Sequence, residues 1–111
     1  MLNQIVLVGR LTKDVEVKEG ENGSKYAVLS LAIPRSWKNA EGQYDTDFVE
    51  CKAFESIATN TSEYCRQGDI VGVKGRIQST VEENENGEKT TKMEIIAERV
   101  TFLSSKPKDE E

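Results

Sequence analysis

Five short strand-like segments with one helix candidate among them restrict this chain to a small all-β architecture. The strand-like segments are residues 3–11, 25–33, 48–54, 69–80 and 93–103, which are rich in β-branched or alternating apolar residues. The helix candidate, residues 56–66, lies between the third and fourth segments; Ser56 is expected as its N-cap and Gly68 as its terminator. Strands and helices do not alternate, which disfavours a parallel sheet. This order predicts an OB-fold, a five-stranded Greek-key barrel with one short helix between strands three and four.

Two polar segments separate neighbouring strands, and both are expected to be long loops. Residues 36–47 (SWKNAEGQYDTD) follow Pro34, which is expected to stop the second strand from continuing as a central strand. Residues 82–88 (EENENGE) contain the hairpin signal Asn86-Gly87. The length of 111 residues fits one domain, predicted as residues 1–104, followed by a short, flexible acidic tail at 105–111.

Charge distribution decides whether nucleic acid remains a possible partner. The net charge of −5 argues against it, because phosphate binding needs clustered Lys and Arg. However, residues 1–80 carry 10 Lys and Arg against 11 Asp and Glu, whereas residues 81–111 carry 5 against 9. The excess acid is therefore concentrated late in the chain, and an earlier surface can still bind phosphates.

Other function classes find little support in the composition. The chain has no His and no CxxC motif, so no metal site is expected, and no catalytic residue or cofactor is predicted. Cys51 and Cys65 are expected to be buried, reduced thiols. With neither a signal peptide nor an apolar run of about eighteen residues, a cytoplasmic location without membrane contact is expected.

The third strand carries the most informative pattern, because successive side chains of a strand point to opposite faces. Val49, Cys51 and Ala53 are small and apolar, as a barrel interior requires. The other face carries Phe48 and Phe54 together with charged residues, among them Lys52. Aromatic rings interleaved with cations are typical of platforms on which bases stack and phosphates are neutralised. Burial of both rings under a helix, a loop or a partner subunit is the alternative for this strand alone.

Two further groups of cations strengthen the platform interpretation. In the fourth strand Val71, Val73, Gly75 and Ile77 share the inward phase, so Lys74 and Arg76 are expected to project outward together. After the second strand, Trp37 stands between Arg35 and Lys38. The predicted site therefore consists of three stacking rings and a set of phosphate-binding cations: Trp37, Phe48, Phe54, Arg35, Lys38, Lys52, Lys74, Arg76, Arg10 and Lys13.

Over almost its whole length the sequence resembles bacterial single-stranded-DNA-binding proteins. The resemblance is carried by NQIVLVGRLTKDVEV, LSLAIPRSWKNAEGQ, TDFVECKAFESIATNTSEYCRQGDIVGVKGRIQS and NGEKTTKMEIIAERV, in the family's order and spacing. It implies an OB-fold that binds single-stranded DNA without sequence preference in replication, repair, recombination or DNA uptake. It also implies base stacking by the aromatics at the three positions above, and a homotetramer whose contacts include the amino-terminal strand.

This sequence departs from the family pattern in two places. Thr80 and Glu82 stand where members usually carry a basic residue and then a fourth stacking aromatic. Full-length members also continue into a linker with an acidic tip that recruits replication and repair proteins, whereas this chain stops at KPKDEE. Weaker binding is therefore expected, and partner recruitment is not carried over.

Three alternatives remain open from the sequence. One is a dimeric OB-fold primosomal accessory protein, which acts mainly through protein contacts. The second is a nuclease that uses a metal held by the acids of the late loop, although no activated base accompanies them. The third is an interaction domain whose aromatic face is buried against another protein. The acids concerned are Glu82, Glu83, Glu85 and Glu88.

Overall fold

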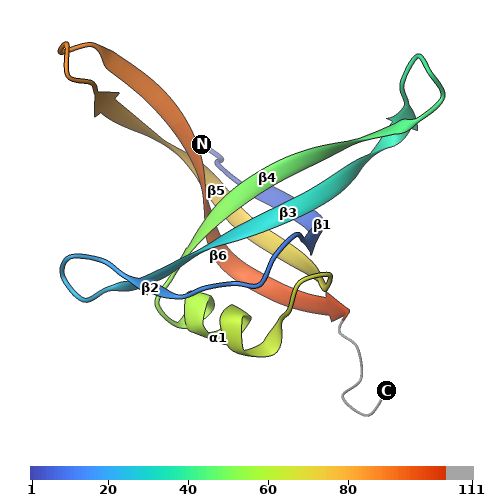
Figure 1. Ribbon diagram of the computed structural model, residues 1–111, viewed down its shortest axis with the longest axis horizontal. Helices are drawn as coiled ribbons and strands as arrows, with labels where there is room; N and C mark the ends of the chain where they lie inside the picture. The colour runs from blue at the N-terminus through green and yellow to red at the C-terminus, as the bar shows by residue number, and fades with distance from the viewer. Residues whose placement is uncertain (105–111) are drawn as a thin grey trace.

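The strands form one continuous sheet that curls until its ends meet. The computed structural model describes residues 1–104, so the predicted acidic tail at 105–111 lies outside the described residues. Along the chain the elements are β1 (Ile5–Leu11), β2 (Lys18–Glu19), β3 (Lys25–Lys38), β4 (Tyr44–Phe54), α1 (Ser56–Tyr64), β5 (Ile70–Glu83) and β6 (Lys89–Ser104) (Figure 1).

The strand pairing closes a barrel of five strands. The sheet order is β1-β5-β6-β4-β3-β2, and β1 also pairs with β3 through Arg10 opposite Ala32 and Leu11 opposite Leu31. The two-residue strand β2, which the sequence did not predict, only extends the edge of β3. Helix α1 lies between the third and fourth barrel strands, here β4 and β5. The predicted all-β OB-fold is therefore confirmed.

The inward phase of each strand builds the barrel core. Its central residues are fully or almost fully buried: Ala27, Leu29 and Leu31 of β3, Cys51 and Ala53 of β4, and Val71 and Val73 of β5. Helix α1 contributes Ala58 and Thr61 to this layer and lies against one end of the barrel (Figure 1). Cys51 and Cys65 are buried free thiols, as expected, and desolvation raises the pKa of Cys51 to about 11.

Two pairs of strands continue beyond the barrel as ribbon-like arms (Figure 1), where the sequence predicted long loops. The β3–β4 arm turns only at residues 39–43, and the β5–β6 arm only at 84–88. The expectation that residues 36–47 form a loop is wrong, since β3 runs on to Lys38. As expected, however, β3 does not continue as a central strand at Pro34. Beyond Ala32, β3 is bordered by β4 alone. A strand with a single neighbour needs only every second amide, so a proline can be accommodated.

The ends of α1 also differ from the sequence prediction. Ser56 is the first helical residue and not the N-cap; Glu55 occupies that position, with φ of 54° and no side-chain capping bond. The reason is that the Glu55 amide still donates to the Lys25 carbonyl oxygen at 2.8 Å, so the chain stays in the β3–β4 pairing until it bends into the helix. The helix ends at Tyr64, before the predicted terminator Gly68.

Candidate nucleic-acid interface

The outward phase of β4 presents two aromatic rings. Phe48 is 75% exposed and Phe54 43% exposed, whereas Cys51 and Ala53 between them are buried. Six residues of extended strand separate the two rings by roughly 20 Å. A single-stranded nucleic acid lying along β4 (Tyr44–Phe54) would therefore meet one aromatic ring near the middle of the strand and another at its end.

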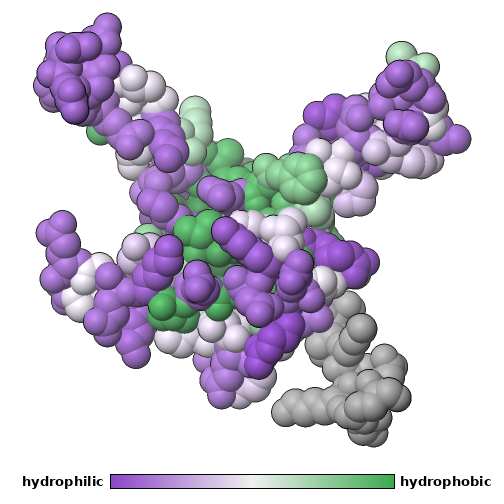
Figure 2. Space-filling view, viewed as in Figure 1, coloured by the Kyte–Doolittle hydropathy of each residue, from purple (hydrophilic) through white to green (hydrophobic). Residues whose placement is uncertain are grey.

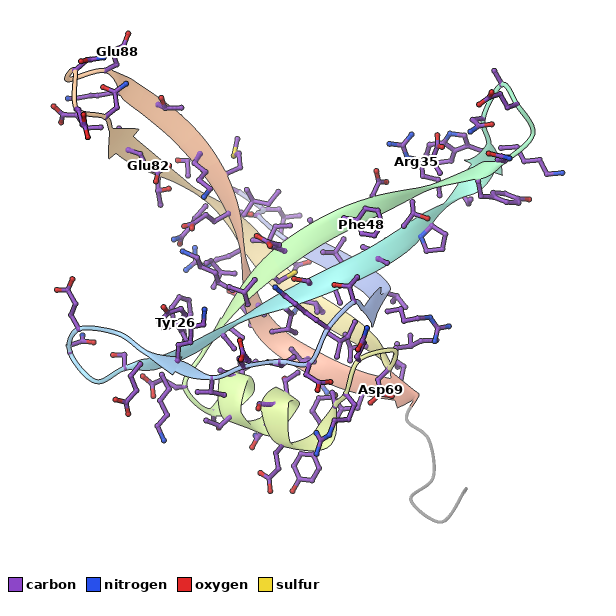
Figure 3. All side chains as sticks on the ribbon, viewed as in Figure 1. Tyr26, Arg35, Phe48, Asp69, Glu82 and Glu88 are labelled. Atoms are coloured by element: carbon purple, nitrogen blue, oxygen red, sulfur yellow. The ribbon has the colours of Figure 1, made fainter. Side chains whose placement is uncertain are left out.

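Tyr26 of β3 joins this face, and sequence reasoning missed it. In the β3–β4 register Tyr26 lies directly opposite Phe54, and residues opposite one another in an antiparallel pair share a face (Figure 3). The signal was present, since Ala27 belongs to the inward phase and its neighbour must therefore point outward. The outer face of β3 and β4 thus carries an aromatic pair at one end and Phe48 nearer the arm.

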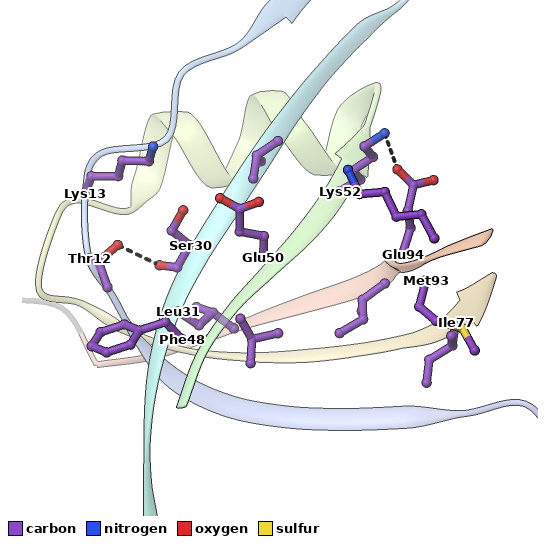
Figure 4. Close-up of a pocket in the computed structure, with 14 residues that line it drawn as sticks. Thr12, Lys13, Ser30, Leu31, Phe48, Glu50, Lys52, Ile77, Met93 and Glu94 are labelled. Carbon is purple, nitrogen blue, oxygen red and sulfur yellow. Dashed lines mark hydrogen bonds and ion pairs between the residues drawn. The ribbon is translucent and has the colours of Figure 1, made fainter. Parts of the chain in front are cut away.

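A groove lies at the mouth of the barrel, where the β3–β4 and β5–β6 pairs diverge (Figure 4). It brings together three predicted site residues, Lys13, Phe48 and Lys52. The opposite wall carries Ile77, which is 39% exposed rather than fully inward as its phase predicted, and Met93, which is 72% exposed. Figure 2 shows hydrophobic surface between the bases of the two arms, while the arm tips are mostly hydrophilic.

The β3–β4 arm carries the third predicted ring. Trp37 is 64% exposed, and Tyr44 on the paired strand is 57% exposed. The Lys38 ammonium lies 5.9 Å from the centroid of the Tyr44 ring, within cation–π range. The structure therefore places an additional aromatic residue beside the predicted Lys38, on the arm that carries Trp37.

Arg35, on the same arm, is engaged by two carboxylates of its own chain. Its Nε donates to Asp47 Oδ2 at 3.1 Å and its Nη2 to Asp47 Oδ1 at 2.9 Å. Asp45 Oδ2 lies 3.7 Å from Arg35 Nη1. These hydrogen bonds lower the pKa of Asp47 and raise that of Arg35. The guanidinium, labelled in Figure 3, is therefore held in place and its charge compensated.

Two other predicted phosphate-binding cations are also paired. Lys52 forms an ion pair with Glu94 at the groove, and the hydrogen bond from Lys52 lowers the pKa of Glu94 (Figure 4). Arg76 Nε lies 3.5 Å from Glu98 Oε2, and Arg76 Nη1 donates to Gln78 Oε1 at 2.7 Å.

Two predicted cations lie away from the residues that line this groove. Arg10 Nη1 donates to the Gly68 carbonyl oxygen at 2.7 Å, and Arg10 borders a second, shallower cleft with Val8 and Pro34. Lys74 is exposed on β5, where its neighbours in the sheet are Val6 of β1 and Arg99 of β6. The structure therefore lines the groove with Lys13 and Lys52 and leaves Arg10 and Lys74 outside that lining, although Arg10 is in the same cross-strand row as Phe48.

The acidic segment forms the outer part of the β5–β6 arm. Glu82 is exposed on β5, opposite Thr90, and Glu88 lies in the turn, where its carboxylate accepts a hydrogen bond from Asn84 (Figure 3). Within residues 1–104, no cluster of three or more His, Cys, Asp or Glu residues could hold a metal ion. Within the same range, no helix is long and apolar enough to cross a membrane.

Comparison with known proteins shows the family of the chain. Residues 2–103 match the model of the single-strand binding protein family. Single-stranded DNA-binding protein B of Bacillus subtilis (strain 168) is 43% identical over 109 residues, which cover 98% of this chain and 96% of that protein. Single-stranded DNA-binding protein 1 of Staphylococcus aureus (strain COL) is 41% identical over 106 residues, 96% of this chain and 64% of that protein.

A further relative shows how the chain compares in length. Single-stranded DNA-binding protein A of Bacillus subtilis (strain 168) is 40% identical over 106 residues, 96% of this chain and 62% of that protein. The chain thus spans nearly all of protein B but less than two thirds of the other two relatives. On the match of residues 2–103 and on these identities, the chain belongs to the single-strand binding protein family.

Proposed function

We propose that this protein binds single-stranded DNA without sequence preference, coating and protecting it during replication, repair, recombination or DNA uptake. The observation that carries the proposal is the groove at the base of two arms that exposed Phe48 lines together with Lys13 and Lys52. Family membership and the printed names of the relatives support it. Every base has a π-face, so recognition by stacking tolerates any sequence.

In this proposal Trp37, Phe48 and Phe54 stack on bases, and Tyr26 and Tyr44 extend the same surfaces. Phosphates are met by the cations of the groove and the β3–β4 arm, chiefly Lys13, Lys38, Lys52 and Arg35. Arg10 lies in the same cross-strand row as Phe48, because Arg10 faces Ala32 and Ala32 faces Phe48. Arg76 and Lys74 on β5 contribute through longer-range attraction. Thr80 and Glu82 supply no fourth ring, so binding is weaker than that of a protein with one.

The test is a titration with labelled oligo-dT at fixed salt, followed by fluorescence anisotropy. Phe48→Ala and Trp37→Ala should each weaken binding about ten- to a hundredfold, because one base–aromatic stack contributes roughly 1–3 kcal/mol. Tyr64→Ala is the matched control: Tyr64 is 62% exposed on α1 and does not line the groove. Wild-type protein that fails to bind oligo-dT at low salt would refute the proposal, and equal affinities for all three variants would refute the stacking assignment.

The proposal includes a homotetramer and a purely binding, non-enzymatic role. Val6 and Val8 leave the outer face of β1 apolar, 69% and 52% exposed, which supports subunit contacts through this strand. Light scattering on the protein alone and with oligo-dT tests the assembly. A cytoplasmic location is consistent with two buried free thiols.

A further inference from the structure

The cations that the proposed function assigns to phosphate are in part already neutralised by carboxylates of the same chain. Arg35 faces Asp47 and Asp45, so one positive charge stands against two negative charges. Asp47 occupies the Nε–Nη2 edge of the guanidinium, which is also the edge that binds a phosphate through two hydrogen bonds. A phosphate that approaches Arg35 therefore meets a site of net charge −1 in which this edge is filled.

The same situation recurs at the groove, on a different pair of strands. Lys52 of β4 is ion-paired with Glu94 of β6. The Glu94 side chain is only 12% exposed and that of Lys52 is 42% exposed, so the carboxylate lies beneath the ammonium at the groove surface. Glu94 faces Gln78 across the β5–β6 ladder, and the hydrogen bond from Lys52, with smaller effects of Gln78 and Lys92, lowers the pKa of Glu94. The central cation of the aromatic face thus has an intramolecular counterion.

We propose that Asp47 and Glu94 limit the affinity for DNA by acting as resident competitors of phosphate, so that binding requires Arg35 and Lys52 to exchange or share a carboxylate. This inference rests on the proposed function. Binding of phosphates is driven by the release of salt ions that are condensed on DNA. A protein cation that is already neutralised by its own chain displaces fewer of these ions. The two carboxylates therefore reduce both the strength and the salt dependence of binding.

The fold does not depend strongly on the Asp47 carboxylate, whereas Glu94 is more buried and its replacement needs a stability check. Exposed ion pairs contribute little to stability, with a median near zero to about 1 kcal/mol. The Arg35 and Asp47 side chains are 40% and 49% exposed. Amides at positions 47 and 94 preserve the shape and remove the charge, and they replace one acceptor oxygen by an NH2 donor, so the ion pair is broken. Each pair can be altered separately, with the more exposed Asp47 as the safer site.

The experiment measures oligo-dT affinity over a series of NaCl concentrations for the wild type, Asp47→Asn and Glu94→Gln. Each variant should bind several-fold more tightly at low salt, and the slope of log K against log salt should steepen by about 0.7, the value for one added phosphate contact on a single strand. Glu63→Gln is the control, because it removes the same charge from α1, outside the groove. The gain from Glu94→Gln should disappear in a Lys52→Met background, where no cation is freed.

Unchanged slopes, or affinities that rise no more than for Glu63→Gln, would overturn the inference. Weaker binding by Glu94→Gln would overturn it too, since the carboxylate would then serve to position Lys52. Thermal melts monitor folding. If Glu94→Gln has a much lower Tm than the wild type, the test relies on Asp47→Asn, which alters the more exposed ion pair. Absence of binding by the wild type would count against the proposed function itself, whereas a binding wild type with unresponsive variants would count only against this inference.

Discussion

Replacing Gly75 with alanine should destabilise the barrel severely, and the magnitude follows from one contact. A Cβ at this position would lie 2.0 Å from the Ile96 carbonyl oxygen, where ordinary contact begins at 3.4 Å. The atom that it meets belongs to the backbone of the paired strand, and an irregularity in the β5–β6 register falls between Lys74 and Gly75. Side-chain rotation cannot relieve this overlap, so β5 and β6 must separate.

The expected cost combines lost pairing with overpacking. Two ladder hydrogen bonds at about 1 kcal/mol each, with overpacking of about 1–3 kcal/mol, give a loss of roughly 3–5 kcal/mol. In a domain of this size about 1 kcal/mol lowers Tm by roughly 4 °C or more, so Tm should fall by at least about 12 °C.

The measurement is thermal unfolding by circular dichroism at matched protein concentration, since assembly couples concentration to Tm. Gly20→Ala is the control, because its Cβ would meet nothing closer than 3.7 Å. A Gly75→Ala protein that melts within a few degrees of the wild type would show that β5 and β6 can part at little cost, which contradicts the reasoning.

Three further changes test other parts of the fold. Glu55→Gly should raise stability by about 1 kcal/mol in urea unfolding, because φ of 54° strains any residue with a Cβ, whereas Glu63→Gly within α1 should lower it by a similar amount. Asn3→Ala should cost about 1 kcal/mol in the same assay, because the Asn3 amide exchanges two hydrogen bonds with the backbone of Ile77 at 2.7 and 3.0 Å. Burial raises the pKa of Cys51 from 9.0 to about 11, so between these pH values the folded state keeps a proton that the unfolded state releases. The contribution of Cys51 to stability should therefore be unchanged below pH 9 and fall between pH 9 and 11. A Cys51→Ala protein that shows the same fall would contradict this assignment.

The barrel and its aromatic face could be predicted because both depend on local pattern. Strand residues alternate strictly between two faces, so the small inward residues around Cys51 and Ala53 determined that Phe48 points outward. The structure agrees on this point, with Phe48 three-quarters exposed and both small residues buried. The same rule applied to β3 yields Tyr26. The segment was characterised by its inward residues Ala27, Leu29, Leu31 and Ile33, and its outward residues were not considered.

The ion pairs could not be predicted, because they depend on register and on how far each arm extends. Lys52 and Glu94 are 42 positions apart in the numbering and meet only because β4 and β6 pair in parallel where the barrel closes. Arg35 reaches Asp47 because β3 continues past Pro34. The polar composition of residues 36–47 had predicted a loop there. Arg10 likewise donates to Gly68, a carbonyl in the connection after α1. Local propensity contains no information on such contacts.

The position of β1 has a consequence for how the chain is made. β1 is the first strand to be synthesised, yet its long ladder is with β5, where Ile5 faces Gly75, and only two residue pairs join it to β3. At roughly 5–20 residues per second, a ribosome needs several seconds to produce that partner, and pairings so distant in sequence also form slowly. Throughout that time the inward residues of β1, Ile5, Leu7 and Leu11, have no barrel to bury them. Recognition of this segment by a chaperone, or its aggregation when synthesis stalls before β5, is therefore built into the order of the strands.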